Sequence, residues 1–217
     1  MNRKTVLFDL DGTLTDPKVG ITTAAARALS AFGIRRAPDE LTGFIGPPLE
    51  ESFMGDYGMT RAQSDEAVRE YRAYYNETGW RENVPYPGIA ECLEALRSRG
   101  RTLLVATSKP EEMARRILSH FGLDEYFTLI CGAHPEQGRS SKKADVIAEA
   151  LTRAGCARAD AVMVGDRRHD VVGARENGLP CIGVLYGYGS RSELEDAGAA
   201  AIAEDLGQLL TLLCREE

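Results

Sequence analysis

The stretch Val6-Leu7-Phe8-Asp9-Leu10-Asp11-Gly12-Thr13-Leu14-Thr15 places two aspartates directly after a short apolar run. The apolar run predicts a strand in the middle of a sheet, where ionised carboxylates cost several kcal/mol each unless they are compensated. Two carboxylates at the end of such a strand indicate a bound cation, and Mg²⁺ prefers carboxylate, carbonyl and phosphate oxygens. The competing interpretation is an ordinary Asp-Gly turn after a strand.

Further segments of the same kind recur along the chain. Short apolar runs flanked by turn residues occupy 102–106, 126–131, 161–164 and 180–185. Helical patterns separate them, and Gly100, Gly122 and Gly155 stand where helices are expected to end. Strands that alternate with helices predict an α/β fold with a Rossmann-like, doubly wound parallel sheet.

Residues 16–84 interrupt this alternation and show no strand pattern. Asp16-Pro17 is typical of a helix start, with Asp16 as N-cap and proline in the first turn, and an alanine-rich helix is expected over 21–32. Thr60 and Gln63 have the spacing of a capping box before a long helix. We therefore expect an all-helical cap domain at 16–84, inserted into an α/β core made of 1–15 and 85–217.

Composition excludes some classes of partner. The net charge is −7, the sequence pI is about 5.2, and no Lys/Arg cluster is long enough to follow a nucleic-acid backbone. No stretch approaches transmembrane length, and the five scattered cysteines form no Cys-x-x-Cys pair. The sequence thus predicts a cytoplasmic protein with reduced thiols that binds neither nucleic acid nor membrane, and it leaves open a monomer or a homodimer.

Reactive residues follow three of the predicted strands. The first strand is followed by Asp9 and Asp11, the second by Thr107-Ser108-Lys109, and a later one by Gly165-Asp166 with Asp170 one helical turn on. Ligands of open α/β sheets bind beyond the carboxyl ends of the strands, so these residues are expected to meet at one edge.

Each of these residue types has a chemical use at such an edge. A carboxylate beside a metal can attack a phosphoryl group and form an aspartyl-phosphate. Asp11, two residues along an extended chain, is expected on the same side as Asp9, where it can protonate the leaving oxygen and later deprotonate water. Thr107 and the backbone N–H groups that begin the next helix are expected to bind an anion, and a lysine would complete the neutralisation of its charge.

The chain resembles the haloacid dehalogenase superfamily of phosphotransferases over essentially its whole length. The family's first motif matches Asp9 through Thr13, its second matches Thr107, and its fourth matches Gly165, Asp166 and Asp170. For the lysine of the third motif Lys142 and Lys143 compete, and Lys143 is the better match because it stands two residues before Val-Ile. The helical insert resembles the first cap type of the family, shared by phosphoglycolate phosphatases and β-phosphoglucomutases.

The resemblance implies a role for each matching residue. Asp9 would be the nucleophile and Asp11 the acid/base, with Thr107 and Lys143 completing the catalytic set. Mg²⁺ would be held by Asp9, the Asp11 backbone carbonyl and Asp166, with Asp170 in support. Further candidates for contacts with the phosphate or the substrate are Gly12, Thr13, Ser108, Lys109 and Gly46. His169 is disfavoured as a ligand, because a lone histidine does not make a zinc site.

Segments 46–53 and 107–110 look most like a subgroup described as 5′-nucleotidases, often also labelled phosphoglycolate phosphatases. This resemblance implies a Mg²⁺-dependent phosphomonoester hydrolase for small phosphorylated metabolites, with nucleoside 5′-monophosphates ahead of phosphoglycolate. A sugar phosphomutase of the β-phosphoglucomutase type and a non-catalytic regulatory module are the rivals. A carbon–halogen dehalogenase is disfavoured, because such enzymes have no need of Asp11 or of a metal.

Overall fold

The structure is a computed structural model that describes residues 3–134 and 142–214. The chain divides into two compact units. The core unit comprises Met1–Thr15 and Pro85–Glu217, and the second unit comprises Asp16–Val84. The chain passes between the units in two short strands, β2 (Thr15–Asp16) and β3 (Val84–Pro85), which pair with each other.

The core unit is built on a parallel sheet. Within the described residues the sheet has six strands in the order β5-β4-β1-β6-β7-β8. These strands are β1 (Thr5–Phe8), β4 (Thr102–Pro110), β5 (Leu129–Ala133), β6 (Ala161–Gly165), β7 (Cys181–Val184) and β8 (Ala201–Ala203). Their parallel pairing confirms the predicted doubly wound α/β architecture, in which the connections between strands are helical.

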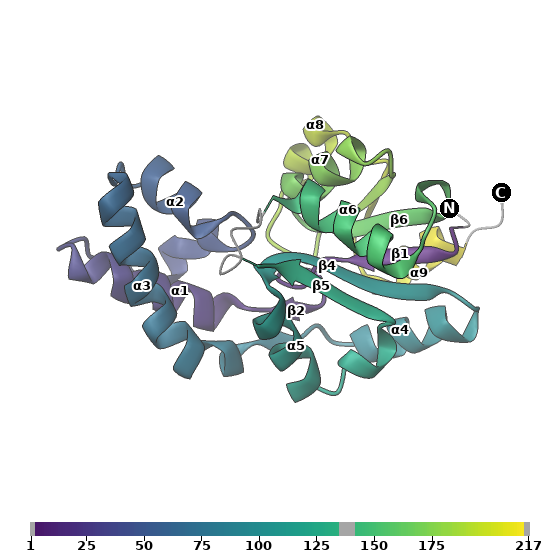
Figure 1. Cartoon of the computed structure of the whole chain (residues 1–217), viewed down its shortest axis with the longest axis horizontal. Coiled ribbons are helices and arrows are strands. Elements are labelled where there is room, and N and C mark those ends of the chain that lie inside the picture. Colours follow the sequence, from purple (N-terminus) through teal and green to yellow (C-terminus); the bar gives the residue numbers. More distant parts are fainter. Residues whose placement is uncertain (1–2, 135–141, 215–217) are drawn as a thin grey trace. The chain divides into compact units, whose positions relative to one another are not determined.

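Helices cover both faces of this sheet (Figure 1). They are α4 (Ile89–Ser98), α5 (Glu111–His120), α6 (Lys143–Ala154), α7 (Arg168–Glu176), α8 (Arg191–Ala197) and α9 (Leu206–Cys214), with short 3₁₀ turns η3 (Asp124–Tyr126) and η5 (Arg158–Asp160). Figure 1 shows α6, α7 and α8 on one face and α4 and α5 on the other, and α9 packs against α4. The sheet is therefore buried on both sides, which explains the continuous apolar runs in its strands.

The register of β1 brings three strand ends to one level. Phe8 is aligned with Val105 on β4 and with Val164 on β6. All four residues of β1 are buried, so the strand exits directly from the core. Asp9 and Asp166 therefore follow their strands at the same edge of the sheet, at its carboxyl end.

Several element boundaries differ from those expected. The segment expected at 126–131 becomes a strand only at Leu129, because Asp124–Tyr126 forms η3. The strand expected at 102–106 continues to Pro110, and β8 was not expected at all. The alanine-rich, three-residue β8 has too little apolar pattern to be recognised, and its place in the sheet comes from pairing with β7.

The second unit is helical apart from its two ends. Its helices are α1 (Lys18–Ala31), η1 (Pro38–Phe44), α2 (Leu49–Gly55), α3 (Arg61–Glu77) and η2 (Gly79–Glu82). The capping box at Thr60 and Gln63 is present as expected. The expected N-cap at Asp16 is wrong by one residue: Pro17 is the N-cap of α1, and the Asp16 carboxylate accepts a hydrogen bond from the Lys18 N–H at 2.9 Å.

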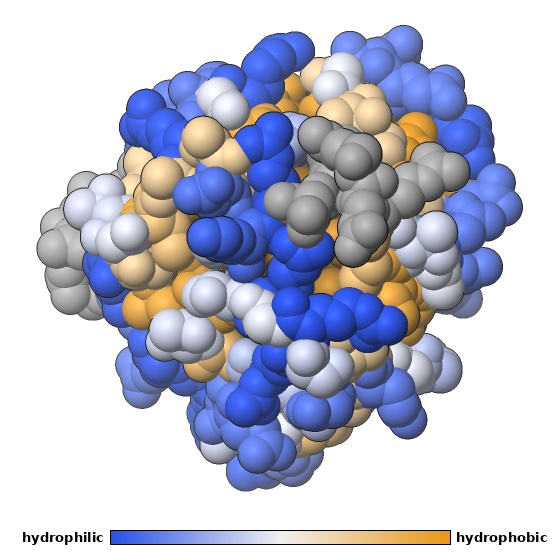
Figure 2. All heavy atoms as spheres, turned by 90° about the vertical axis from the view of Figure 1, so that its right-hand side faces the viewer, coloured by the Kyte–Doolittle hydropathy of each residue, from blue (hydrophilic) through white to orange (hydrophobic). Residues whose placement is uncertain are grey.

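Figure 2 shows the face of the molecule at the right of Figure 1. Hydrophilic residues cover most of it, and hydrophobic residues show between them. Among residues 3–134 and 142–214, no helix is long and apolar enough to cross a bilayer.

Candidate active site

A buried lysine joins two aspartates at the carboxyl edge of the sheet. Lys143, the first residue of α6, places its Nζ 2.7 Å from Asp9 Oδ1 and 2.9 Å from Asp170 Oδ1. It also donates to the backbone carbonyl of Ala106 at 3.2 Å. Burial opposes the charge of this ammonium, but Asp170 and Asp9 outweigh it and raise the pKa of Lys143 above its ordinary value.

Three carboxylates lie together at this site, close enough for their oxygens to share one cation. One oxygen from each of Asp9, Asp166 and Asp170 lies within 4.8 Å of the others, and all three residues are buried. Burial and the neighbouring Asp170 and Asp9 raise the pKa of Asp166 well above its usual range. Burial also raises the pKa of Asp170 to about 6, against the opposing charge of Lys143. One lysine therefore does not compensate three acids, and an all-oxygen donor set of this kind fits Mg²⁺.

Glycine backbones enclose Asp166 so closely that side chains would not fit. A Cβ on Gly12 or Gly187 would overlap the side chain of Asp166, and one on Gly189 would overlap its backbone oxygen. The backbone N–H of Tyr188 donates to Asp166 Oδ2 at 2.8 Å. Asp166 is thus held from two loops, after β1 and after β7.

The loop after β7 is not identified as part of the site by its sequence. By its sequence, Gly187-Tyr188-Gly189 fits either a border of the site or a plain glycine loop. Glycines on both sides of one residue were the available signal, but their partner Asp166 stands more than 20 residues away in the chain.

Asp11 is paired with a second lysine. Asp11 Oδ2 lies 2.7 Å from Lys109 Nζ, and both side chains are almost fully buried. Among the described residues Asp11 Oδ1 has no hydrogen-bond partner. Burial raises the pKa of Asp11, although Lys109 opposes the rise. A carboxyl group with these properties is suited to carrying a proton.

We expected the alternation of an extended strand to bring Asp11 to the side of Asp9, but the strand ends before both residues. β1 ends at Phe8, and Leu10 lies in a bend whose carbonyl accepts hydrogen bonds from the N–H groups of Thr13, Leu14 and Thr15. The proximity of the two acids therefore comes from this turn.

The segment 107–109 also differs from expectation. It was expected at a helix start, but α5 begins only at Glu111, after Pro110, which has no N–H. Thr107 to Lys109 instead bulge out of β4, and the Lys109 N–H donates to Thr107 Oγ1 at 3.3 Å. The backbone N–H groups next to Thr107 in the chain therefore belong to this bulge.

The remaining candidate residues lie in several different surroundings. Thr13 Oγ1 donates to Asp166 Oδ1 at 3.4 Å, and Ser108 is half-buried in the bulge. Lys142 is exposed, next to the buried Lys143. Gly46 lies in the second unit and stays a prediction. The cluster of potential metal ligands found among the described residues, Asp9, Asp166 and Asp170, does not include His169.

The crowded carboxylates predict an unusual pH dependence of stability in the metal-free protein. Because the folded protein raises the pKa of Asp170 from 3.8 to about 6, it binds more protons than the unfolded chain between these values. The free energy of unfolding in EDTA should therefore fall as the pH rises from about 4 to about 6. Asp166 and Asp11 act in the same direction, because their pKa values are raised as well.

Urea unfolding at several pH values, in EDTA and in excess Mg²⁺, measures this effect. Mg²⁺ binds the deprotonated carboxylates, so its stabilising effect should grow over the same pH range. Asp170→Asn should make the free energy of unfolding in EDTA depend less steeply on pH. The same slope between pH 4 and pH 6 in the wild type and in Asp170→Asn would contradict the raised pKa of Asp170, because other groups, such as Glu111 with its lowered pKa, contribute equally to both proteins.

Comparison with known proteins places this geometry in a family. The model of the haloacid dehalogenase-like hydrolases matches residues 6–184. A solved structure described as a predicted phosphatase from Clostridium acetobutylicum is 42% identical, with a TM-score of 0.95, and the match covers 98% of this chain and 99% of that one.

Two curated relatives carry different names. A 5′-nucleotidase from Pseudomonas aeruginosa is 46% identical over 210 residues, which cover 96% of this chain and 94% of that protein. The tyrosine-protein kinase PtkA of Mycobacterium tuberculosis is 40% identical over 198 residues, which cover 91% of this chain and 67% of that protein.

Proposed function

Because this chain belongs to the haloacid dehalogenase-like hydrolase family, we propose that it is a phosphatase of nucleoside 5′-monophosphates whose reaction depends on Mg²⁺. The observation that carries the proposal is the meeting of Asp9, Asp166 and Asp170 beside Lys143, with Asp11 in the adjoining turn. The substrate class rests on the relative named 5′-nucleotidase.

The proposed reaction has two steps, both at phosphorus. Asp9 attacks the phosphoryl group, so that a bond forms between its carboxylate oxygen and phosphorus while the ester P–O bond breaks. Asp11 gives its proton to the leaving oxygen and the nucleoside departs. Asp11 then takes a proton from water, the water oxygen attacks phosphorus, and the bond to Asp9 breaks to release inorganic phosphate.

The remaining residues of the site would bind and orient the phosphoryl group. Lys143 holds Asp9 in place and supplies one positive charge, and Lys109 supplies another beside Asp11. Thr107, Ser108, Gly12 and Thr13 are the proposed contacts of the phosphate oxygens. Mg²⁺, held by Asp9, Asp166, the Asp11 carbonyl and Asp170 in support, would neutralise phosphate charge and lower the repulsion between two anions.

The cell compartment and the second unit complete the proposal. All five cysteines are free thiols, which supports a proposed location in the reducing environment of the cytoplasm. We propose that the second unit, Asp16–Val84, acts as a cap that selects substrates by the group attached to the phosphate. Gly46 is a candidate contact of the substrate in this unit.

A panel of phosphomonoesters, assayed for phosphate release with Mg²⁺ and with EDTA, tests this proposal. Nucleoside 5′-monophosphates should be turned over fastest, and EDTA should abolish their turnover. Rapid hydrolysis of phosphoglycolate with inert nucleotides would reverse the substrate assignment. Isomerised sugar phosphate without phosphate release would indicate a mutase. No release from any substrate would overturn the phosphatase assignment of this site.

The relative named a tyrosine-protein kinase adds one further candidate for the phosphoryl acceptor. In that reaction a nucleoside triphosphate would phosphorylate Asp9 and leave as the diphosphate, and a tyrosine hydroxyl would then replace water as the attacking group. Incubation with ATP, Mg²⁺ and a tyrosine-containing peptide distinguishes hydrolysis from transfer to tyrosine. Phosphotyrosine without release of free phosphate would favour transfer over hydrolysis.

A further inference from the structure

The bulge that carries Thr107 to Lys109 is held against the neighbouring strand β5. Ala106 pairs with Cys131 and Pro110 pairs with Ala133, so three residues of β4 stand opposite the single residue Gly132. A bulge of this kind changes the direction of the side chains that it carries and interrupts the regular strand pairing, so other contacts must stabilise it.

Gly132 allows the two backbones to approach unusually closely. A Cβ at this position would lie 2.6 Å from the backbone oxygen of Lys109 and 2.6 Å from the Cα of Glu111. The base of the bulge therefore rests directly on β5. The side chain that follows the bulge, Glu111, is then in a position to fasten it.

Glu111 ties three elements together through one buried carboxylate. Its Oε1 accepts hydrogen bonds from Arg115 Nε at 3.1 Å and Arg115 Nη2 at 2.8 Å, within α5. Its Oε2 accepts from Arg153 Nη1 of α6 at 2.6 Å and from the Gly132 N–H of β5 at 3.4 Å. His134 Nε2, just after β5, lies 3.3 Å from the same oxygen.

These contacts keep the carboxylate charged despite its burial. Burial opposes the charge, but the hydrogen bonds of Arg153 and Arg115 lower the pKa of Glu111 to about 2. Arg153 is near the end of the helix that Lys143 begins, so the carboxylate links the bulge with the element that carries the proposed active-site lysine.

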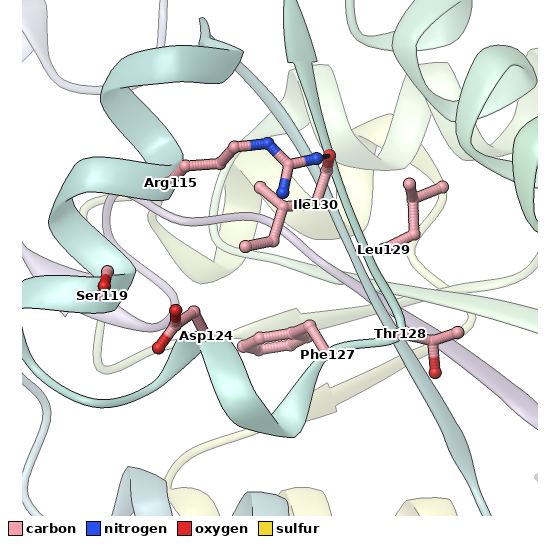
Figure 3. Close-up of a pocket in the computed structure, with 7 residues that line it drawn as sticks. All are labelled: Arg115, Ser119, Asp124, Phe127, Thr128, Leu129 and Ile130. Carbon is pink, nitrogen blue, oxygen red and sulfur yellow. Dashed lines mark hydrogen bonds between the residues drawn. The ribbon is translucent and has the colours of Figure 1, made fainter.

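Arg115, one of the two arginines that bind Glu111, also joins α5 directly to β5. Figure 3 shows the Arg115 side chain reaching from α5 to the backbone of Ile130, where Nη2 donates to the carbonyl at 2.8 Å. Beyond it the surface is hollowed into a pocket of about 340 Å³, lined also by Ser119 and Phe127. On this side α5 and β5 are therefore joined by polar contacts.

From this arrangement we infer that Glu111 is a positioning residue for the proposed active site. By fastening the base of the bulge to β5 and α6, it keeps Lys109 on Asp11. Glu111 acts through Lys109 and makes no contact with substrate. The inference rests on the proposed phosphatase function.

The variant Glu111→Gln tests it, because glutamine keeps the size of the side chain and removes its charge. With the best substrate of the panel, kcat/KM should fall roughly 10-fold to 100-fold, since small misplacements of catalytic groups have effects of this size. Glu149→Gln is the matched control: Glu149 also pairs with Arg153, at 3.4 Å, but it lies within α6. The kcat/KM of Glu149→Gln should stay within about twofold of the wild-type value.

A double-mutant cycle with Lys109→Met separates positioning from a general loss of stability. If Glu111 acts through Lys109, Glu111→Gln should cause little further loss when Lys109 is already absent. An equal loss in both backgrounds, or a folded Glu111→Gln with wild-type kcat/KM, would overturn the inference. If Glu111→Gln does not fold, Arg153→Met, which removes the link to α6 and leaves Glu111 bound to Arg115 and Gly132, takes its place in the cycle.

Hydrogen exchange provides a readout that does not depend on activity. The Gly132 N–H donates to Glu111, so its exchange and that of the amides at 107–109 should be faster in Glu111→Gln than in the wild type or in Glu149→Gln. Unchanged exchange at these amides would overturn the inference. Failure of the wild type to hydrolyse any phosphomonoester would instead overturn the proposed function, which the substrate panel reports separately.

Discussion

Asp9→Asn should reduce phosphate release by at least about 10³-fold, because an amide cannot serve as the attacking oxygen in the proposed first step. The substitution keeps the shape of the side chain and removes one of three crowded buried carboxylates, so the variant should still fold. Wild-type protein quenched during turnover should carry an acyl phosphate that hydroxylamine cleaves, and Asp9→Asn should carry none.

The control for this variant is Asp145→Asn, an exposed aspartate in the first turn of the helix that begins at Lys143. Its turnover should match the wild type. Urea unfolding of both variants establishes that they are folded. Phosphate release by Asp9→Asn at the wild-type rate from every active substrate would show that the nucleophile is another residue.

Lys143→Met should damage both activity and stability. The ammonium lies between Asp9 and Asp170, and its removal leaves these buried carboxylates without their cation. Breaking a buried ion pair by deleting one partner typically lowers the free energy of unfolding by about 3–5 kcal/mol. We expect a loss of this size at pH 7 in EDTA, together with a fall in kcat of about 10²-fold, typical of losing one stabilising charge.

Lys142→Met makes the same chemical change one residue earlier, at an exposed position. It should change the free energy of unfolding by less than about 0.5 kcal/mol and leave kcat nearly unchanged. Excess Mg²⁺ should restore part of the stability lost in Lys143→Met, because the metal supplies positive charge to the same carboxylates. Equal losses from the two substitutions would contradict the assignment of Lys143.

The choice between these two lysines illustrates where sequence reasoning ends. Motif spacing favoured Lys143 without excluding Lys142, since both precede the same helix. The packing of α6 against α7 and the sheet buries one of them and exposes the other. A shift of one residue turns a side chain by about 100° around a helix, so its direction depends on which face of the helix is buried.

Features with local causes were predicted well. Gly100, Gly122 and Gly155 were expected to end helices, and each adopts the left-handed backbone conformation that favours glycine there. The capping box at Thr60 depends on residues three apart, and it forms as expected. The apolar run before Asp9 was recognised as a central strand because burial on both faces leaves no alternation.

Features whose partners lie far apart in the chain were missed or misplaced. The bulge at 107–109 depends on Gly132, and the network at Glu111 depends on Arg153, some 40 residues later. The loop at 187–189 has no distinctive pattern until its contact with Asp166 is seen.

The order and chemistry of the motifs were therefore sufficient to predict the α/β fold and the acids that meet at the edge of its sheet. Apolar periodicity and the positions of Asp9, Asp166 and Asp170 are properties of short segments, and parallel strands bring their carboxyl ends together in a regular way. The pairing of each acid with its lysine, the bulge behind Lys109 and the glycine enclosure of Asp166 arise only when distant backbones pack. Such contacts depend on distances of a few ångströms between segments, and no short stretch of sequence encodes those distances.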